Sequence, residues 1–368
     1  MKKKILYIAS LDSIHTLKWI DYFQKLNYEI SVVSLTEKNE DFKFSNNPNL
    51  YIYNNYKNKY LNTFHCLISI FFKMKFFSKN EITHVHYIGL NGLISMMCNT
   101  KNLILTAWGD DVKTNKKNFF KNFLLKLLFK KSKVVTTDSN EMKNLMCEIS
   151  KDLKNKTKII NFGIDTELFS KKKYSFEIEK KLKLEKFRDH LKIISLRNHD
   201  KIYDIETLIH SIKKLIEFNK KVKCLIYGNG TETIKLQQLT LALNLQNNIS
   251  FMGRYRQQEL PYIFSIMDCY VSTSLSDAGI AASTAEAMAC ELPSISSNNS
   301  ENNIWINHGG SGFLFNNRDT DGLTNILKNL KNYNLSNIGS ESRKIIIKNN
   351  DYNNEMTKMD EIYKNLLS

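Results

Sequence analysis

The sequence predicts an α/β protein of two Rossmann-like domains, each built on a doubly wound parallel sheet. Its length of 368 residues is too great for one ordinary domain and suits two domains. Short apolar runs alternate with longer amphipathic segments in both halves, as βα units require. A polar, Lys-rich stretch from Ser170 to about Asp189 separates the two series and predicts a linker. We therefore expect domains at residues 1–170 and 190–350 that face each other across a cleft, with ligands at the carboxyl ends of the strands.

The apolar runs give the expected strands. In the first half they are Lys4 to Ala9, Glu29 to Ser34, Leu50 to Tyr53, Ile82 to Tyr87, Asn102 to Ala107 and Lys133 to Thr137. In the second half they are Lys192 to Leu196, Lys221 to Tyr227, Asn248 to Met252, Asp268 to Ser272 and Gly312 to Phe315. The last segment, roughly Leu335 to Ser368, predicts one or two amphipathic helices, and packing of residues 350–368 on the first domain is one expectation.

The charge is positive and unevenly distributed. The chain carries a formal +16, and residues 1–170 hold 26 lysines, no arginine and 15 acidic residues. Such a field favours nucleic acid, an anionic membrane or a phosphorylated substrate, with a solvated Lys-rich surface as the alternative. The six cysteines form no C-x-x-C pair and suit reduced core thiols in a cytosolic protein. No apolar run approaches the length of a membrane span, so we expect any membrane contact to be peripheral.

The most informative segment follows the strand that ends at Ser272. It opens with small residues and continues as an Ala-rich helix, which places backbone N–H groups and a positive helix end where a diphosphate can bind. The expected diphosphate contacts are Gly279, Ile280, Ala281 and Ala282. Glu286 lies just inside the helix, where its carboxylate can accept hydrogen bonds from ribose hydroxyls; the alternative is an ordinary exposed helical glutamate.

Two cations follow the first strand of the second half. Arg197 and Lys201 suit a leaving diphosphate, because fixed cations stabilise its growing charge without a metal. The alternative is that both lie on a solvated loop. Gly228 and Gly230 end a later strand, where such a pair makes a tight turn more often than it binds phosphate.

These residues resemble those of family-4 (group 1) retaining glycosyltransferases with the GT-B fold. Glu286 and the following Ala-Met-Ala-Cys match the second glutamate of their E-x7-E region. The first glutamate falls at Ala278, and Asp277 is the carboxylate one residue earlier. Residues 161–169 are similar to the family's N-G-V-D-x-x-x-F turn, and residues 227–230 with 249–253 to its G-x-G strand end and next strand. Arg197 and Lys201 take the places of the family's arginine and lysine, one residue closer together than usual.

The resemblance implies transfer of a sugar from a nucleotide diphosphate sugar, with a UDP-sugar expected, to an acceptor hydroxyl with retention of configuration. Arg197, Lys201 and Asp277 would be catalytic, and Gly228, Tyr255 and Glu286 would join the helix start in binding the donor. No cofactor and no metal are expected. The D-x-D pattern of Asp319 and Asp321 begins a helical segment, so helix capping is the preferred interpretation.

The first half offers candidate acceptor contacts. His15 follows the first strand, where the family has paired glycines, and the backbone of Ser13 and Ile14 is the alternative. His84 and His86 share one face of their strand, and His86 is the preferred acceptor contact. Trp108 replaces the family's histidine; it can stack on a sugar or fill the cleft wall. Asp110 or Asp111 could orient the acceptor hydroxyl, with helix capping as the alternative.

Two basic, aromatic segments suggest a membrane surface. Residues 116–133 predict a helix with Phe120, Phe123, Leu124, Leu127 and Leu128 on one face, and residues 71–77 cluster exposed-looking aromatics beside lysines. The alternative is that these apolar faces pack on the sheet. Nucleic acid is not expected, since no RRM or helix-turn-helix arrangement occurs.

We thus expect a cytoplasmic glycosyltransferase, peripheral on the inner face of the plasma membrane, in the synthesis of surface polysaccharide, lipopolysaccharide, lipid-linked oligosaccharide or glycoprotein glycan. A nucleotide-sugar epimerase and a non-catalytic nucleotide-sugar-binding homologue are the two alternatives.

Overall fold

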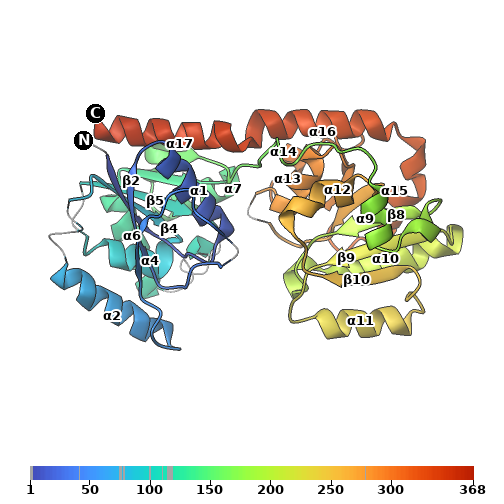
Figure 1. The fold of residues 1–368 in the computed structure, drawn as a ribbon, viewed down its shortest axis with the longest axis horizontal. Coiled ribbons are helices and arrows are strands. Elements are labelled where there is room, and N and C mark those ends of the chain that lie inside the picture. The colour runs from blue at the N-terminus through green and yellow to red at the C-terminus, as the bar shows by residue number, and fades with distance from the viewer. Residues whose placement is uncertain are drawn as a thin grey trace. The chain divides into compact units, whose positions relative to one another are not determined.

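The computed structural model describes residues 3–40, 42–73, 77, 79–98, 101–109, 111–113, 119–277 and 279–368. The chain divides into two compact units (Figure 1). Unit 1 comprises Met1–Phe162 and Asn353–Ser368, and unit 2 comprises Gly163–Tyr352. Each is an α/β unit with its own parallel sheet. No helix within the described ranges is both long and apolar enough to cross a bilayer.

The described residues of unit 1 form a seven-stranded sheet in the order β3-β2-β1-β4-β5-β6-β7, with all neighbours parallel. Its strands are β1 (Lys4–Ile8), β2 (Glu29–Ser34), β3 (Asn49–Ile52), β4 (Ile82–His86), β5 (Asn102–Ala107), β6 (Val134–Thr137) and β7 (Thr157–Ile159). Its helices include α1 (Ile14–Lys25), α2 (Lys59–Phe72), α4 (Ile88–Ser95), α6 (Phe119–Lys131), α7 (Asn140–Ile149), α8 (Leu153–Lys156) and α17 (Tyr352–Leu367).

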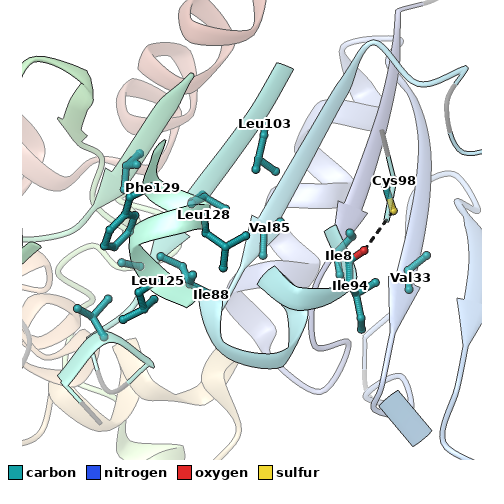
Figure 2. Close-up of a cluster of buried hydrophobic side chains, with 14 of the residues drawn as sticks. Ile8, Val33, Val85, Ile88, Ile94, Cys98, Leu103, Leu125, Leu128 and Phe129 are labelled. Atoms are coloured by element: carbon teal, nitrogen blue, oxygen red, sulfur yellow. Dashed lines mark hydrogen bonds between the residues drawn. The ribbon is translucent and has the colours of Figure 1, made fainter. Parts of the chain in front are cut away.

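The core of unit 1 lies between the sheet and the helices α4 and α6 (Figure 2). Ile8, Val33 and Val85 project from neighbouring strands toward apolar side chains of both helices. Gly92 of α4 lets α6 approach closely, because a Cβ atom there would lie 2.6 Å from Leu128 Cδ1. The two helices are therefore held against each other as well as against the sheet.

The C-terminal helix α17 completes unit 1. Met356, Met359 and Tyr363 are fully buried, and Tyr363 Oη lies 2.6 Å from both Tyr7 Oη and His84 Nδ1. His84 Nε2 lies 2.6 Å from Thr106 Oγ1. This buried network ties the last helix of the chain to β1, β4 and β5.

Unit 2 has a six-stranded parallel sheet, counted over its described residues, in the order β10-β9-β8-β11-β12-β13. The strands are β8 (Leu191–Ser195), β9 (Val222–Tyr227), β10 (Ile249–Gly253), β11 (Cys269–Ser272), β12 (Ser294–Ser297) and β13 (Phe313–Phe315). The helices are α9 (Phe176–Lys181), α10 (Ile205–Phe218), α11 (Thr233–Ala242), α12 (Leu260–Phe264), α13 (Ala282–Ala289), α14 (Asn302–Trp305), α15 (Thr320–Asn329) and α16 (Leu335–Asn350), with four 3-10 turns, η1 (Glu185–Phe187), η2 (Lys201–Tyr203), η3 (Gln257–Glu259) and η4 (Leu330–Asn332).

The predicted α/β class and the two parallel sheets are confirmed. The structure adds β7 and β12, which were not predicted, because both are short and β12 is almost all serine. The expected linker between residues 170 and 189 instead contains α9, where buried Glu179 accepts two hydrogen bonds from Arg188. An ordered helix therefore stands where the Lys-rich composition suggested a spacer.

Candidate functional site

The strand order of unit 2 reverses between β8 and β11, which lie side by side at the centre of the sheet. In doubly wound sheets, ligands bind beyond the carboxyl ends of the strands at this switch point. Arg197 lies two residues beyond β8, and residues 273–281 follow β11. The fold thus brings the two predicted donor segments to one edge of unit 2.

Arg197 and Asp277 meet there in a nearly buried ion pair. Arg197 Nη2 donates to Asp277 Oδ1 over 2.5 Å, with only 10% and 8% of the two side chains exposed. The guanidinium carbon lies 4.5 Å from the centre of the Tyr203 ring. Burial lowers the pKa of Arg197, but the charge and hydrogen bond of Asp277, together with Tyr270 and Tyr203, outweigh burial, so this pKa lies above the usual value. Arg197 therefore keeps a fixed positive charge, and its buried Nε has no hydrogen-bond partner among the described residues.

The loop that carries Asp277 is fastened by the turn after β12. Asp277 N donates to Asn299 Oδ1 over 3.1 Å, and Ser300 Oγ donates to Asp277 O. Asn299 Nδ2 also donates to Ser274 O over 2.5 Å. Sequence reasoning missed Asn299, since β12 itself was not predicted. Ala278, where the family has its first glutamate, lies outside the described residues.

Helix α13 begins as predicted, after Ala281. Ala281 has extended backbone angles, and no side chain in the described part of the chain caps the helix start. Gly279, Ile280 and Ala281 are buried, whereas Ala282 is partly exposed. In the first turn, Ser283 Oγ lies 2.8 Å from the hydroxyl of Tyr270. Tyr270 also contributes to the pKa shifts of Arg197 and Tyr255, so these groups lie within electrostatic range of one another.

Glu286 is not the ordinary exposed glutamate that the sequence left as an alternative. Only 5% of it is exposed, and its Oε1 accepts a hydrogen bond from Gln257 Nε2 over 2.9 Å. Burial and the nearby Glu286 charge raise the pKa of Tyr255 well above its usual value. The Tyr255 ring also lies edge-on to Tyr227, with 6.0 Å between centroids. Two predicted donor contacts, Glu286 and Tyr255, therefore lie near each other.

Gly228 packs directly against the backbone of Arg197. Its φ is +115°, and a Cβ atom there would lie 2.3 Å from the carbonyl oxygen of Arg197. Gly230 similarly abuts the backbone of His199, whose N–H donates to Asn229 O over 3.1 Å. This glycine pair makes a tight turn, and in doing so it positions the β8 loop.

Lys201 is exposed at the start of η2. It lines a pocket of about 360 Å³ that also includes Lys235 and Arg318. Arg197 lies instead with Asp277 and Tyr203. The structure therefore gives Arg197 a defined electrostatic environment and leaves Lys201 on the surface of unit 2.

Three predicted acceptor residues meet in unit 1. The ring of Trp108 lies 5.8 Å from His86 and 6.0 Å from His15, and Trp19 lies 5.0 Å from His86. These residues follow or end β1, β4 and β5, at the carboxyl edge of the sheet. Two buried nitrogens, Trp19 Nε1 and His86 Nε2, have no hydrogen-bond partner within the described residues. Sequence reasoning did not single out Trp19.

The two histidines of β4 share one face, as predicted, with 4.6 Å between ring centroids. Both are fully buried, and burial lowers the pKa of His86 to about 3. His84 belongs to the Tyr363 network, whereas His86 Nδ1 lies 3.2 Å from Thr16 Oγ1. Both imidazoles are therefore neutral near pH 7.

Asp110 lies outside the described residues. The neighbouring Asp111 is buried, and its carboxylate accepts hydrogen bonds from the backbone of Ile88, Trp108 and Gly109 over 2.8 to 3.1 Å. Burial raises its pKa to about 6 despite these bonds. Asp111 therefore fixes the backbone: it accepts from the first N–H of α4, a helix distant in sequence, and it fastens the Trp108 loop.

No group of His, Cys, Asp or Glu side chains able to hold a metal ion occurs among the described residues. Asp319 caps α15, since its Oδ1 accepts from Gly322 N over 2.8 Å, which confirms the capping interpretation of the D-x-D pattern.

Two protein-family models match this sequence. The model "Glycosyl transferases group 1" matches residues 176–351, and "Glycosyl transferase 4-like" matches residues 4–139. Two matches to one class of enzyme thus cover most of both units. The chain belongs to the group 1, family-4-like glycosyltransferases with the GT-B fold.

The chain is also similar to individual glycosyltransferases. An uncharacterized glycosyltransferase of Methanocaldococcus jannaschii is 28% identical over 59% of this chain and only 52% of its own length. The N-acetyl-alpha-D-glucosaminyl L-malate synthase of Bacillus anthracis is 23% identical over 78% of this chain and 75% of its own. Among solved structures, Anabaena HepE in complex with UDP superposes with a TM-score of 0.79 at 14% identity, covering 99% of this chain and 100% of HepE. At that identity the likeness shows the fold.

Proposed function

We propose that this chain transfers a sugar from a UDP-sugar to an acceptor hydroxyl, with retention of configuration and without a metal. The observation that carries the proposal is the buried Arg197–Asp277 pair at the switch point of unit 2. Burying a guanidinium whose Nε lacks a partner among the described residues is costly on a solvated loop. In a diphosphate site the anionic ligand can supply that partner. That UDP is bound by HepE, of the same fold, supports the choice of nucleotide.

In this proposal unit 2 binds the donor. The open start of α13, from Gly279 to Ala282, binds the diphosphate through backbone N–H groups, and Arg197 neutralises it, with Lys201 as a second cation. Glu286 accepts hydrogen bonds from the ribose, since its carboxylate is held by Gln257. Gly228 and Tyr255 complete the donor site beside it.

The proposed chemistry is a same-face displacement. The bond between the anomeric carbon and the diphosphate oxygen breaks while the acceptor oxygen forms the new bond on the same face. The acceptor proton passes to the leaving phosphate oxygen. Arg197 stabilises the charge that grows on that oxygen, and Asp277 keeps Arg197 oriented until the diphosphate arrives.

Unit 1 would bind the acceptor. Partly exposed His15 and Trp108 line the carboxyl edge of its sheet, fully buried His86 packs against Trp108, and Trp108 can stack on a sugar face. Asp110 stays a candidate for orienting the hydroxyl. The acceptor is proposed to be a growing glycan, as a surface polysaccharide, a lipid-linked oligosaccharide or a protein glycan. The six free cysteines, all within the described residues, suit action in the reducing cytoplasm.

A screen of nucleotide sugars tests this function. Purified protein is incubated with each of several UDP-hexoses and UDP-N-acetylhexosamines, and thermal unfolding then identifies the stabilising donor. Release of UDP and growth of an acceptor pool from cell extract are expected with that donor. Conversion of the donor to its epimer without acceptor would show an epimerase instead. An intact donor in the presence of acceptor would show a binding protein.

A further inference from the structure

Helix α2 of unit 1 exposes its apolar face to solvent, unlike an ordinary surface helix. Its apolar side chains point outward, and Phe72 is 81% exposed. The outward residues are Tyr60, Leu61, Phe64, Ile68, Phe71 and Phe72. At 100° per residue these positions fall within about 120° of the helix circumference. The inner face buries Asn62 and Thr63 together with Cys66 and Ile70. Figure 1 shows α2 along the side of unit 1 opposite α17.

Helix α6 repeats this arrangement. Phe119, Phe120, Phe123 and Leu127 are exposed, and Phe119 is 91% exposed. The opposite face buries Leu125, Leu128 and Phe129 in the core, as Figure 2 shows. The face that packs on the sheet thus shares only Leu128 with the apolar face predicted from the sequence. Phe77, by contrast, is fully buried, so the predicted cluster at residues 71–77 is only partly exposed.

The charges around both stripes have one sign. Residues 57–73 and 119–133 contain eight lysines and no aspartate or glutamate. Lys57, Lys59, Lys73, Lys121, Lys126, Lys130, Lys131 and Lys133 are all exposed. An apolar stripe surrounded by lysines alone complements a surface of negative headgroups over hydrocarbon.

A pocket of about 490 Å³ is lined by residues of both helices. Lys59 and Tyr60 of α2 line it, as do Lys121, Leu124 and Leu128 of α6. Leu90 and Leu93 of α4 form its inner wall. Ser10, Thr36, Asn91 and Asp111 also line it, so the recess is not wholly apolar.

We propose that the exposed stripes of α2 and α6 form a docking face that binds unit 1 to an anionic bilayer. The aromatic side chains enter the boundary between headgroups and acyl chains, and the lysines contact the lipid phosphates. The docking face lies wholly within unit 1 and does not depend on the donor chemistry proposed for unit 2.

Vesicle flotation tests the docking face. The full chain is mixed with vesicles of phosphatidylcholine alone or with 30% phosphatidylglycerol, about the composition that gives a strongly anionic surface. Wild-type protein is expected to float with the anionic vesicles and to be released as NaCl rises. The double variant Phe72→Ser/Phe120→Ser should bind at least about tenfold more weakly, since two apolar anchors are lost.

The matched control removes two equally exposed aromatics from unit 2. Phe176→Ser/Phe218→Ser should leave flotation unchanged, because Phe176 and Phe218 lie outside the docking face. All four positions are exposed, so folding is expected to survive, and a thermal melt verifies it. Lys126→Gln/Lys130→Gln should reduce the preference for anionic vesicles.

Three results would overturn the proposal. One is wild-type protein that stays unbound by anionic vesicles at low salt. Another is binding that the Phe72→Ser/Phe120→Ser variant retains in full. The third is a dimer by light scattering that this variant dissociates, which would show a second copy as the occupant of the face.

Discussion

Arg197 donates to Asp277 across 2.5 Å at the carboxyl edge of the unit 2 sheet, and both side chains are about nine-tenths buried. In the absence of a ligand the carboxylate neutralises the guanidinium. A diphosphate that enters this site has to share Arg197 with Asp277 or displace it. In the proposed function the ion pair therefore connects folding stability with donor binding, and it gives the first two predictions.

Arg197→Ala should slow transfer by about 2 to 4 kcal/mol of transition-state stabilisation, as loss of one charge-stabilising donor does. Turnover of the stabilising UDP-sugar measures this loss. Arg188→Ala is the control, since Arg188 pairs with Glu179 elsewhere in unit 2. A variant with near-normal turnover would remove Arg197 from the mechanism.

Asp277→Asn should destabilise the ligand-free protein, because breaking a buried ion pair costs about 3 to 5 kcal/mol. UDP should then raise the melting temperature more than it does in the wild type, because the diphosphate supplies the missing negative charge. Differential scanning fluorimetry with and without UDP measures both effects. An equal UDP-induced shift in the two proteins would mean that Asp277 and the diphosphate do not share Arg197.

Gly228→Ala should weaken UDP binding, whereas Gly253→Ala should affect only stability. Both glycines have positive φ, so both substitutions strain the backbone. Only at position 228 would the new Cβ lie within 2.3 Å of the Arg197 carbonyl, and no atom lies within 4 Å at position 253. Calorimetric titration with UDP compares the folded variants. Equal UDP affinity in the two would separate the glycine turn from the donor site.

Tyr363→Phe should lower the free energy of unfolding by about 1 to 3 kcal/mol, because His84 Nδ1 and the Tyr7 hydroxyl lose a buried partner. Urea unfolding measures the change. Tyr262→Phe, at an exposed position, is the control and should be nearly neutral. No loss of stability in Tyr363→Phe would show that α17 is held by apolar packing alone.

His86 should make unit 1 less stable in acid. Its pKa is about 3 in the folded chain against 6.5 when exposed, so the unfolded chain binds the proton more readily. The stability that this group contributes is complete above pH 6.5 and declines as the pH falls toward 3, by at most about 1.4 kcal/mol per pH unit.

Urea unfolding between pH 6.5 and 4 measures this effect. In His86→Gln, the free energy of unfolding should depend less steeply on pH than in the wild type. His15, with a pKa of about 4, leaves a residual slope of the same sign. Asp111, with its raised pKa of about 6, contributes the opposite slope. Identical slopes in wild type and His86→Gln would contradict the assignment.

The fold could be predicted where the pattern is strong. Long apolar runs separated by amphipathic helices predict two parallel sheets, but β12 reads Ser-Ile-Ser-Ser and gives no such signal. Nor could the sequence decide which side of α6 faces the sheet, because both sides carry large apolar residues. That choice depends on tertiary packing.

The site was predictable to the same degree. Local motifs predicted Arg197, Asp277 and Glu286 as candidates, and the structure brings the first two into contact. Tyr203, Tyr270 and Asn299 carry no motif, since each joins the site only through a contact distant in sequence.

UDP binding by unit 2 through Glu286 is the most direct test of the proposed donor site. Isothermal titration calorimetry with UDP compares the wild type with Glu286→Gln, and exposed Glu217→Gln is the control. The wild type and the control are expected to bind UDP, and Glu286→Gln at least about tenfold more weakly, since a carboxylate hydrogen bond contributes about 1.5 to 3 kcal/mol. Wild-type protein that binds no UDP, or a Glu286→Gln variant of unchanged affinity, would contradict the proposed donor site.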